Sequence, residues 1–527
     1  MLRQPLPRLF LKHALACAVV LSVMPAIISM GILILAGDLL YRVFSPLIKA
    51  RPYKRKKCDT TRASIVVLNW NGRDLLARGL PSVLEATRYD GEAHELIVVD
   101  NGSTDGSVDF VRENFPSVKM VALERNMRFT GGNNAGVKAS KNDIVVFLNN
   151  DMVVDRAFLR PLLEGFEKED DVFAISSQVF FWDETRRREE TGKTRARFEK
   201  GTIEFWHEAV AETNEGGLGP AFWGGGGSCA WDRDKYLELG GLDTLYDPFY
   251  LEDTDLSYRA WKRGWKVLFA PDSKVYHKHR GTNKPIFGDD YIERAIRKNR
   301  HLFFWRNITD ISWIIQHFLY LPYSLTTTMV HGKLKDILSF LWALKQFPEA
   351  FVKRYKGRRG IKLSDEMVFK ISSNPFYLWR HLGMRSAPLN SRDHVDFNED
   401  HEGQLGTGWA GLEGELGGRW RWMGLEATAL LRADSRKDTL EIKGFALLEH
   451  IIGKRIEIRV YVNGKLIGAK ALFKSGDFTF LAKLPPSSGG EVLEVKVKVN
   501  KTFNPKALGL SDDARSLGIA VRSIYLK

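Results

Sequence analysis

The sequence is poor in cysteine and contains no internal repeat. Its 527 residues include three cysteines, Cys17, Cys58 and Cys229, which lie far apart. This number and spacing exclude a disulfide framework and a zinc site with four cysteine ligands. Hydrophobic residues make up 44% of the chain, with 31 phenylalanines and 14 tryptophans, so a disordered or low-complexity protein is excluded as well. The length predicts about two to four domains.

Acidic residues are outnumbered, 64 against 78 basic ones, which gives a formal net charge of +14. Such an excess indicates an anionic partner: nucleic acid, a membrane surface or a phosphorylated substrate. Part of the excess follows an uncharged run near the N-terminus, in the cluster Arg42, Lys49, Arg51, Lys54, Arg55, Lys56 and Lys57. A basic cluster beside a membrane-length run favours anionic lipid headgroups, so we expect a membrane partner and no nucleic acid.

The uncharged run extends over 23 residues, from Ala14 to Ala36. It is long enough to cross about 30 Å of hydrocarbon as a helix, and Pro25 is tolerated inside it. A retained, single-pass anchor is predicted; a cleaved signal peptide is the alternative, disfavoured because no small-x-small site precedes Asp38. The heavier basic flank follows the run, so the rest of the chain is expected in the cytoplasm, at a bacterial inner membrane.

After an anchor and linker at residues 1–62, residues 63–290 alternate between strand and helix patterns. Ser64–Leu68, Glu95–Val99 and Asp143–Leu148 are β-branched runs typical of buried strands, and Leu75–Leu84 has helical spacing. This alternation predicts an α/β domain with a doubly wound, mostly parallel sheet.

Residues 291–390 predict amphipathic helices. Ile311–Val330 is uncharged but contains several polar residues, and a single crossing there would place the basic run Lys353–Arg359 outside. We therefore expect helices that lie in the membrane interface, with packing on the globular core as the alternative. Residues 395–527 predict a separate antiparallel β-sandwich, because short alternating strands surround the hairpin signal Asn463-Gly464. The pattern assigns no ligand to this domain.

Polar residues follow each of the three predicted strands. The first strand leads into Asn69-Trp70-Asn71-Gly72, the second into the segment 100–107, and the third into Asn149-Asn150-Asp151. A lone Asp after a strand is usually a helix cap, which is the alternative interpretation of Asp105 and Ser103. Ligands of open α/β sheets, however, bind at the carboxyl ends of the strands, where these three segments meet.

Between residues 64 and 282 the chain resembles the inverting family 2 glycosyltransferases with the GT-A fold, including rhamnosyl-, galactosyl- and N-acetylglucosaminyltransferases. The matching segments occur in the family's order: VVLNWNGRDLL, VVDNGSTDGS, ERNMRFTGGNNAGV, VVFLNND, GGLDTLYDPFYLEDTDLSYRAWKRGW and VYHKH. The chain departs from the pattern at Arg128, where many relatives have glycine. A mixed-charge insertion at 183–201 is expected to be a solvated loop.

The resemblance implies a divalent cation at the end of the third strand. It assigns Asp151, the last position of a DxD-like motif, as the main metal ligand and His277 as a second one. Oxygen-rich ligands favour Mg²⁺ or Mn²⁺, which would neutralise a diphosphate leaving group. The remaining nucleotide-sugar-binding residues that it implies are Asn71, Asp100, Asn126, Gly131, Gly132, Asn133, Asn150, Gly226 and Gly227. Gly131 and Gly132 also permit close backbone approach to an anion at a helix start, or else form a plain tight turn.

The segment Glu252-Asp253-Thr254-Asp255 opens a predicted helix, whose dipole favours an ionised carboxylate. An inverting transfer needs one ionised base to accept the proton of the acceptor hydroxyl. The resemblance gives this role to Asp253, with Glu252 in reserve and Asp255 as a helix cap.

The implied function is metal-dependent, inverting transfer of a sugar from a nucleotide-sugar donor to a hydroxyl of a lipid-linked or cell-surface glycan. A polyprenyl-phosphate sugar transferase and a membrane-tethered glycan-binding scaffold with a vestigial transferase domain are the alternatives. A sugar nucleotidyltransferase is disfavoured because the first strand is not followed by a glycine-rich loop. A lumenal, Golgi-type location is disfavoured because Asn101-Gly102-Ser103 would be a glycosylation acceptor inside the nucleotide site.

Overall fold

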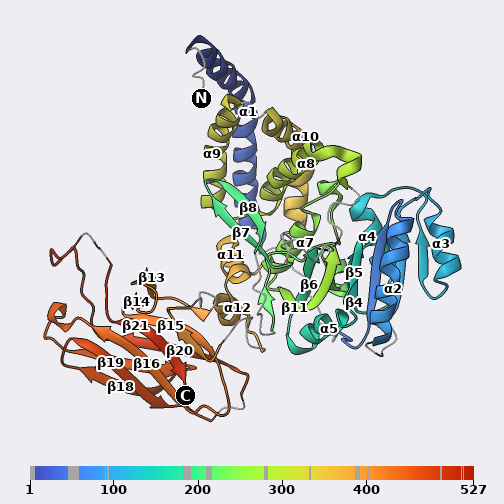
Figure 1. Ribbon diagram of the computed structural model, residues 1–527. Coiled ribbons are helices and arrows are strands. Elements are labelled where there is room, and N and C mark those ends of the chain that lie inside the picture. The colour runs from blue at the N-terminus through green and yellow to red at the C-terminus, as the bar shows by residue number, and fades with distance from the viewer. Residues whose placement is uncertain are drawn as a thin grey trace. The chain divides into compact units, whose positions relative to one another are not determined.

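The structure is a computed structural model that describes residues 6–45, 58–89, 91, 94–181, 192–208, 217–277, 283–331, 334–385, 392–399, 404–486, 489–511, 513 and 515–527. Most of the basic cluster after the N-terminal run, residues 49–57, lies outside these ranges. The chain divides into two compact units, Met1–Glu212 with Pro220–Ser373, and Thr213–Gly219 with Asn374–Lys527 (Figure 1).

The first unit is built on a sheet with the strand order β3-β2-β1-β4-β10-β6-β11-β5. Its strands are β1 (Ala63–Asn69), β2 (Glu95–Asp100), β3 (Lys119–Ala122), β4 (Ile144–Asn149), β5 (Met152–Val154), β6 (Val172–Phe181), β10 (Ser228–Asp232) and β11 (Lys266–His277). The first four are mutually parallel, while β10 runs antiparallel to both β4 and β6. The α/β class and the three strands predicted from β-branched runs are thereby confirmed.

Helices cover this sheet: α2 (Arg73–Tyr89), α3 (Ser107–Asn114), α4 (Arg128–Ala139), α5 (Leu159–Lys168), α6 (Arg233–Glu238) and α7 (Glu252–Lys262). Helix α4 packs on β1 and β2. A Cβ atom at Gly132 would lie 2.4 Å from Leu68 Cδ1, and one at Gly136 would lie 2.3 Å from Val66 Cγ1. The two glycines therefore let the backbone of α4 rest directly on β1.

The expectation of a solvated loop at 183–201 is wrong for its described part. Residues 194–207 form a hairpin of β7 (Thr194–Glu199) and β8 (Thr202–His207). Arg195 is buried in it, where its guanidinium pairs with Glu208 at 2.6 Å and donates to Pro220 O at 2.6 Å and Ser372 O at 3.0 Å. Strand β7 can include the charged Arg195 in its buried part because these internal partners compensate the guanidinium charge. Residues 182–191 lie outside the described ranges.

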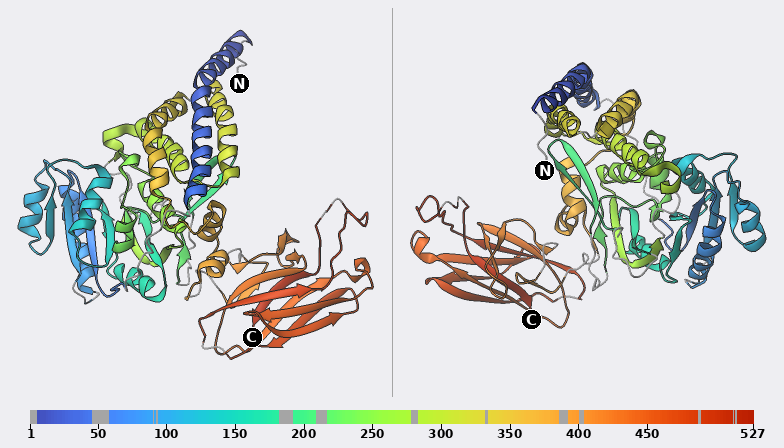
Figure 2. Two further views of the ribbon diagram at one scale, coloured as in Figure 1. Left: turned by 180° about the vertical axis from the view of Figure 1, so that it is seen from behind. Right: turned by 45° about the horizontal axis from the view of Figure 1, so that its top comes forward.

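Long helices complete the first unit: α1 (Leu6–Phe44), α8 (Asn283–Asn307), α9 (Ile311–Val330), α10 (Leu334–Lys356) and α11 (Asp365–Ser373). Helix α1 lies beside α9, and α10 lies beside α8 (Figures 1 and 2). By length and composition, residues 18–44 of α1 form the one helix among the described residues able to cross a membrane. Outward-facing apolar residues on α1 include Leu21, Ile28, Ile32 and Leu40, and those on α9 include Ile315 and Leu319.

Helix α1 is longer than the predicted run because charged residues near its end have partners inside the fold. Asp38 is buried, and its carboxylate pairs with Arg354 of α10 and with Arg358 just after that helix, each at 2.5 Å. Arg42 donates to the carbonyl oxygen of Thr309 at 3.3 Å. The helix therefore continues to Phe44 instead of ending near Ala36.

The second unit is an antiparallel β-sandwich preceded by helix α12 (Pro375–Leu382). One sheet contains β12 (His394–Asp396), β13 (Trp409–Glu413), β14 (Trp420–Met423), β16 (Thr439–Ala446), β19 (Gly476–Lys483) and β21 (Ala520–Leu526). The other contains β15 (Glu426–Arg432), β17 (Ile456–Val462), β18 (Lys465–Leu472) and β20 (Val492–Val499). Side chains from both sheets share one core, and Trp409, Trp420 and Trp422 belong to it or pack against it. Asn463 and Gly464 form the predicted hairpin turn, with φ of 48° and 80°.

Candidate active site

The three strand ends that sequence reasoning placed at one rim are joined by hydrogen bonds. Asn69 at the end of β1 is paired in register with Asp100 at the end of β2, and its Nδ2 donates to Asp100 Oδ2 at 3.1 Å. Asn150, just after β4, donates from Nδ2 to Asn69 Oδ1 at 2.8 Å. A Cβ atom at Gly72 would lie 2.3 Å from Asn150 Nδ2, which explains the glycine after the first strand.

Asn71 and Asp100 hold the loops of this rim in place. Asn71 donates from its backbone nitrogen to Ser103 Oγ at 2.8 Å and accepts from the backbone nitrogen of Thr104 on Oδ1 at 2.8 Å. Asp100 Oδ1 accepts from the backbone nitrogen of Ser103 at 2.9 Å. Asp105 accepts from the backbone nitrogens of Arg73 and Ser107, the first residues of α2 and α3, while no side chain caps α3 at its N-cap, Gly106.

A cavity of about 760 Å³ opens beside this rim, entirely within the first unit. Eight of the predicted site residues line it: Asn126, Asn150, Asp151, Gly226, Gly227, Glu252, Asp253 and His277. The other five do not line it: Asn71, Asp100, Gly131, Gly132 and Asn133.

Gly131, Gly132 and Asn133 lie inside helix α4, which begins at Arg128. The backbone nitrogen of Gly131 donates to Met127 O at 3.1 Å within the helix, and Asn133 Nδ2 donates to Phe129 O at 3.0 Å. Gly132 is therefore explained by the packing of α4 on Leu68 of β1, whereas a Cβ atom at Gly131 would meet Met127 Cβ at 2.7 Å. Gly131 lies in the first turn of α4 and Gly132 directly follows it.

The end of β11 brings His277 to the segment after β4. His277 is paired in register with Met152 of β5, and its Nε2 lies 3.2 Å from Asp151 Oδ2. No group of three or more His, Cys, Asp or Glu side chains able to hold a metal occurs among the described residues. The two side chains form an open pair, which leaves coordination positions for water and for oxygens of a bound ligand.

Asp253 and Glu252 begin helix α7 and differ in their hydrogen bonds. Asp253 Oδ2 accepts from the backbone nitrogen of Gly226 at 2.8 Å, and Oδ1 accepts from that of Thr254 at 2.6 Å. Glu252 Oε2 has no hydrogen-bond partner among the described residues. Burial raises the pKa of both carboxyls, that of Glu252 well above its ordinary value, while the donors to Asp253 act to lower its pKa. Of the two carboxyls, Glu252 therefore holds its proton more strongly, and the donors to Asp253 favour the ionised form of Asp253.

The loop before α7 is held in an unusual backbone conformation. Tyr250 and Leu251 both have φ of 72°, a left-handed region that residues other than glycine seldom adopt. Asn299 of α8, which is fully buried, donates from Nδ2 to the carbonyl oxygens of Tyr246 at 2.7 Å, Phe249 at 3.0 Å and Tyr250 at 2.8 Å. Asn299 thus fixes the loop that presents Glu252 and Asp253. Sequence reasoning missed it, because its partners lie about fifty residues away along the chain.

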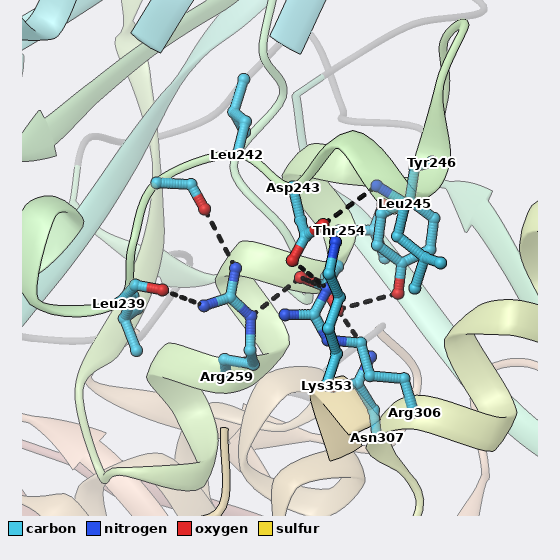
Figure 3. A network of polar contacts seen from close by, with 12 residues as sticks. Leu239, Leu242, Asp243, Leu245, Tyr246, Thr254, Arg259, Arg306, Asn307 and Lys353 are labelled. Atoms are coloured by element: carbon cyan, nitrogen blue, oxygen red, sulfur yellow. Dashed lines mark hydrogen bonds and ion pairs between the residues drawn. The ribbon is translucent and has the colours of Figure 1, made fainter. Parts of the chain in front are cut away.

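Asp255 does not cap α7, contrary to expectation; the residue before the helix is Leu251, and no side chain caps it. The Asp255 carboxylate is fully buried and pairs with Arg259 at 2.8 Å and Arg306 at 3.3 Å. It also accepts from Tyr246 Oη and Asn307 Nδ2, both at 2.8 Å. Figure 3 labels Tyr246, Arg259, Arg306 and Asn307, which belong to this network. Asp255 is therefore a structural link between α7 and α8.

Asn101 is a second residue that sequence reasoning missed. Its Nδ2 donates to Asn126 Oδ1 and to Arg128 O, both at 3.1 Å, and its Oδ1 accepts from the backbone nitrogen of Met127 at 2.7 Å. Its place in the polar run after the second strand was an available signal. Arg128, which it supports, has φ of 63°, the region that favours the glycine found in similar sequences, and its side chain lines the cavity.

The sheet of the first unit has four parallel strands, β1 to β4, with polar residues at their ends and buried carboxylates beside them. These are the features of a GT-A glycosyltransferase. A model of the family "Glycosyl transferase family 2" matches residues 64–217, and one of "Glycosyl transferase family group 2" matches residues 144–348. Residues 64–348 of the chain therefore match glycosyltransferase domains of family 2 type.

The curated relatives match only part of the chain. Polypeptide N-acetylgalactosaminyltransferase 11 of Xenopus tropicalis is 28% identical over 262 residues, which cover 45% of this chain and 42% of the relative. The uncharacterized glycosyltransferase YfnE of Bacillus subtilis (strain 168) is 26% identical over 236 residues, or 41% of this chain and 54% of the relative. The chain thus spans about half or less of the length of these relatives.

Two solved structures are similar at low identity. GalNAc-T7 with UDP, GalNAc and Mn²⁺ has a TM-score of 0.42 and 16% identity, with 72% of this chain and 71% of that chain covered. Mannosyltransferase PcManGT from Pyrobaculum calidifontis, in complex with GDP-Man and Mn²⁺, has a TM-score of 0.31 and 18% identity, with 70% and 95% covered.

Proposed function

We propose that this glycosyltransferase moves a sugar, with inversion, from a nucleotide-sugar donor to a hydroxyl group of a lipid-linked or cell-surface glycan. The observation that carries the proposal is the shared cavity of Asp253 and the Asp151–His277 pair. An anionic base and an open pair of metal ligands are the two components that such a transfer needs.

The donor occupies the half of the cavity next to the strand ends. Asn126, Asn150, Gly226 and Gly227 contact it directly. Side chains at the two glycines would meet Phe129 at 2.9 Å and Asn149 Nδ2 at 2.9 Å, so glycine keeps this wall open. Asn71 and Asp100 act on the donor through the loops that they hold.

A divalent cation, Mg²⁺ or Mn²⁺, fits the Asp151–His277 pair. One carboxylate and one imidazole supply too few ligands for a closed site, and such cations complete their shells with water and phosphate oxygens. When bound, the cation supplies neutralisation of the diphosphate charge that develops as the glycosidic bond breaks.

Asp253 accepts the proton of the attacking acceptor hydroxyl. The backbone N–H groups of Gly226 and Thr254 fix the orientation of its carboxylate and stabilise its charge. Attack from the face opposite the leaving diphosphate inverts the anomeric centre. The raised pKa of Glu252 favours its neutral form, which places no second negative charge beside the base.

Membrane attachment through α1, with the catalytic unit in the cytoplasm at a bacterial inner membrane, is part of the proposal. It is supported by the apolar residues 18–44 and by the basic flank that follows them. The helices α9 and α10 would then lie at the membrane interface, as residues 291–390 predict.

A hydroxyl on a polypeptide is the second candidate acceptor, because several of the relatives are named as N-acetylgalactosaminyltransferases and some of these names specify a polypeptide. Transfer to a polyprenyl phosphate and a non-catalytic scaffold role stay as alternatives.

The test is hydrolysis of a panel of nucleotide sugars by the purified full-length chain in detergent with Mn²⁺. We expect release of one nucleoside diphosphate above the rates of the Asp253→Asn and Asp151→Ala variants. A chain that binds none of the donors would support the scaffold role instead.

A further inference from the structure

The loop that precedes helix α7 determines where the proposed base, Asp253, lies. Tyr250 and Leu251, the two residues before the helix, both have φ of 72°. Such left-handed conformations cost free energy, and they persist only where contacts from outside the segment offset that cost. The position of Asp253 therefore depends on the residues that bind this loop.

Two adjacent residues of helix α8 bind the loop through its carbonyl oxygens. Asn299 donates to three of these oxygens, as described above. A fourth, that of Asp247, accepts from Lys298 Nζ at 2.7 Å. Lys298 is fully buried and is not among the residues that line the cavity, so it acts on the reaction through the loop and not by contact with a substrate.

The surroundings of Lys298 hold its ammonium group between the loop and helix α10. Its Nζ lies over the indole ring of Trp342 of α10, 4.7 Å from the ring centroid. Burial lowers the pKa of Lys298, whereas the carboxylates of Asp247 in the loop and Glu349 of α10 act to raise it, and the resulting pKa is about 8. Glu349 also pairs with Lys353 at 2.6 Å. The bond from Lys298 to the loop is thus charge-assisted at neutral pH and weakens when the amine loses its proton.

We propose that Lys298 is a positioning residue for the transfer reaction, whose ammonium group holds residues 246–251 so that Asp253 faces the acceptor hydroxyl. This inference rests on the proposed function, because it takes Asp253 as the base. It adds a second requirement, since an ionised carboxylate at Asp253 and a charged amine at Lys298 must be present together. The rate should then pass through a maximum, with an acidic limb from Asp253 and an alkaline limb from Lys298.

Stability should respond to the same ionisation in the opposite direction. The pKa of the buried amine is lower in the fold than the ordinary pKa of a lysine, so the contribution of Lys298 to stability rises as pH increases from about 8 toward that ordinary value. Activity should fall over the same pH range if Lys298 positions the loop. A residue that served only the stability of the fold would give no such fall in activity.

The kinetic test compares Lys298→Met and Lys298→Arg with the unmodified full-length chain, in detergent with Mn²⁺ and the donor identified in the hydrolysis screen. We expect Lys298→Met to lower kcat at neutral pH about tenfold or more, because a small displacement of a base is costly, and to remove the alkaline limb. The KM for the donor should change much less. Lys298→Arg keeps a charge at high pH, so it should retain part of kcat there.

Lys345→Met is the matched control, because it makes the same substitution at an exposed lysine of the neighbouring helix α10. It should leave kcat and the alkaline limb unchanged. Thermal unfolding of each variant shows that the fold is retained.

Hydrogen exchange, measured by mass spectrometry, gives a readout that does not require catalysis. At neutral pH the amides of residues 246–251 should exchange several-fold faster in Lys298→Met than in the unmodified chain. This difference should shrink at alkaline pH, where the amine of the unmodified chain is neutral as well. Lys345→Met should exchange like the unmodified chain.

An unchanged kcat in Lys298→Met, or an alkaline limb that persists in this variant, would overturn the inference. Equal exchange of residues 246–251 in Lys298→Met and the unmodified chain would overturn it too, because the loop would then not depend on Lys298. If the unmodified chain released no nucleoside diphosphate from any donor, the proposed function itself would fail, and the exchange measurement would still decide whether Lys298 holds the loop.

Discussion

Replacement of Asp253 by Asn tests the chemical core of the proposed function. Asparagine has the same shape, and its oxygen keeps one of the two backbone N–H bonds that the carboxylate accepts from Gly226 and Thr254. The amide NH₂ group then faces the other N–H, which costs about 1–3 kcal/mol. Loss of the buried charge offsets part of this cost, so we expect the variant to fold.

The loss of activity should be much larger than the loss of stability. A positioned general base contributes about 10²–10⁴-fold in rate, or roughly 3–5 kcal/mol of barrier. Asp253→Asn should therefore lower kcat for sugar transfer by at least about a hundredfold. Nucleotide affinity should change little, because Asp253 contacts no donor atom in this account.

The assay compares the initial rate of transfer with the dissociation constant of the nucleoside diphosphate, both in Mn²⁺. A rate within a few-fold of the unmodified chain would refute the assignment of the base. The pH profile gives an independent check: burial raises the pKa of Asp253, and the base must be ionised. The rate should therefore fall with decreasing pH at a higher pH than an exposed aspartate would give, and Asp253→Asn should remove this limb.

Three further changes test neighbouring carboxylates. Burial raises the pKa of Glu252 in the fold, so the stability that this carboxyl contributes is present at acidic pH and is lost as pH rises above the ordinary pKa of a glutamate. The Glu252→Gln variant should therefore become more stable than the unmodified chain as pH rises. Thermal unfolding at several pH values measures this, and a difference that stays constant with pH would contradict it. Asp151→Ala should weaken donor binding in Mn²⁺ but not without it, and unchanged binding in calorimetry would count against its role as ligand. Asp255→Asn should lower the unfolding free energy by about 3–5 kcal/mol, because it removes the negative charge that pairs with the buried guanidinium groups of Arg259 and Arg306. Stability equal to that of the Asp253→Asn variant would refute the structural role of Asp255.

The sequence predicted those parts of the fold that depend on local patterns. The buried strands β1, β2 and β4 were identified because runs of β-branched residues are typical of strands. The turn at Asn463-Gly464 was identified because this type of hairpin turn needs positive φ at both positions, which Asn and Gly adopt readily. The convergence of Asn69, Asp100 and Asn150 also followed, since parallel strands end at one rim.

The parts that could not be predicted depend on contacts between distant segments. Asn299 and Asp255 act through partners on other helices, which a single sequence does not pair. The hairpin that begins at Thr194 was missed because its charged residues are typical of a loop, and only the fold supplies partners for Arg195. The length of α1 was underestimated because Asp38, like Arg195, is a charged residue whose partner lies far away along the chain.

These distant contacts form one connected path from the proposed base, Asp253, to the membrane-length helix. Asp255, two residues after the base, pairs with Arg306 of α8, and the neighbouring Trp305 accepts on its carbonyl oxygen from Arg354 of α10 at 2.8 Å. Arg354 in turn pairs with Asp38 of α1. Removal of α1 would leave Arg354 buried without its carboxylate, a loss that costs about 3–5 kcal/mol in comparable cases. Helix α1 is thus a structural member of the first unit, and a chain that begins after it should lose stability as well as the proposed membrane attachment.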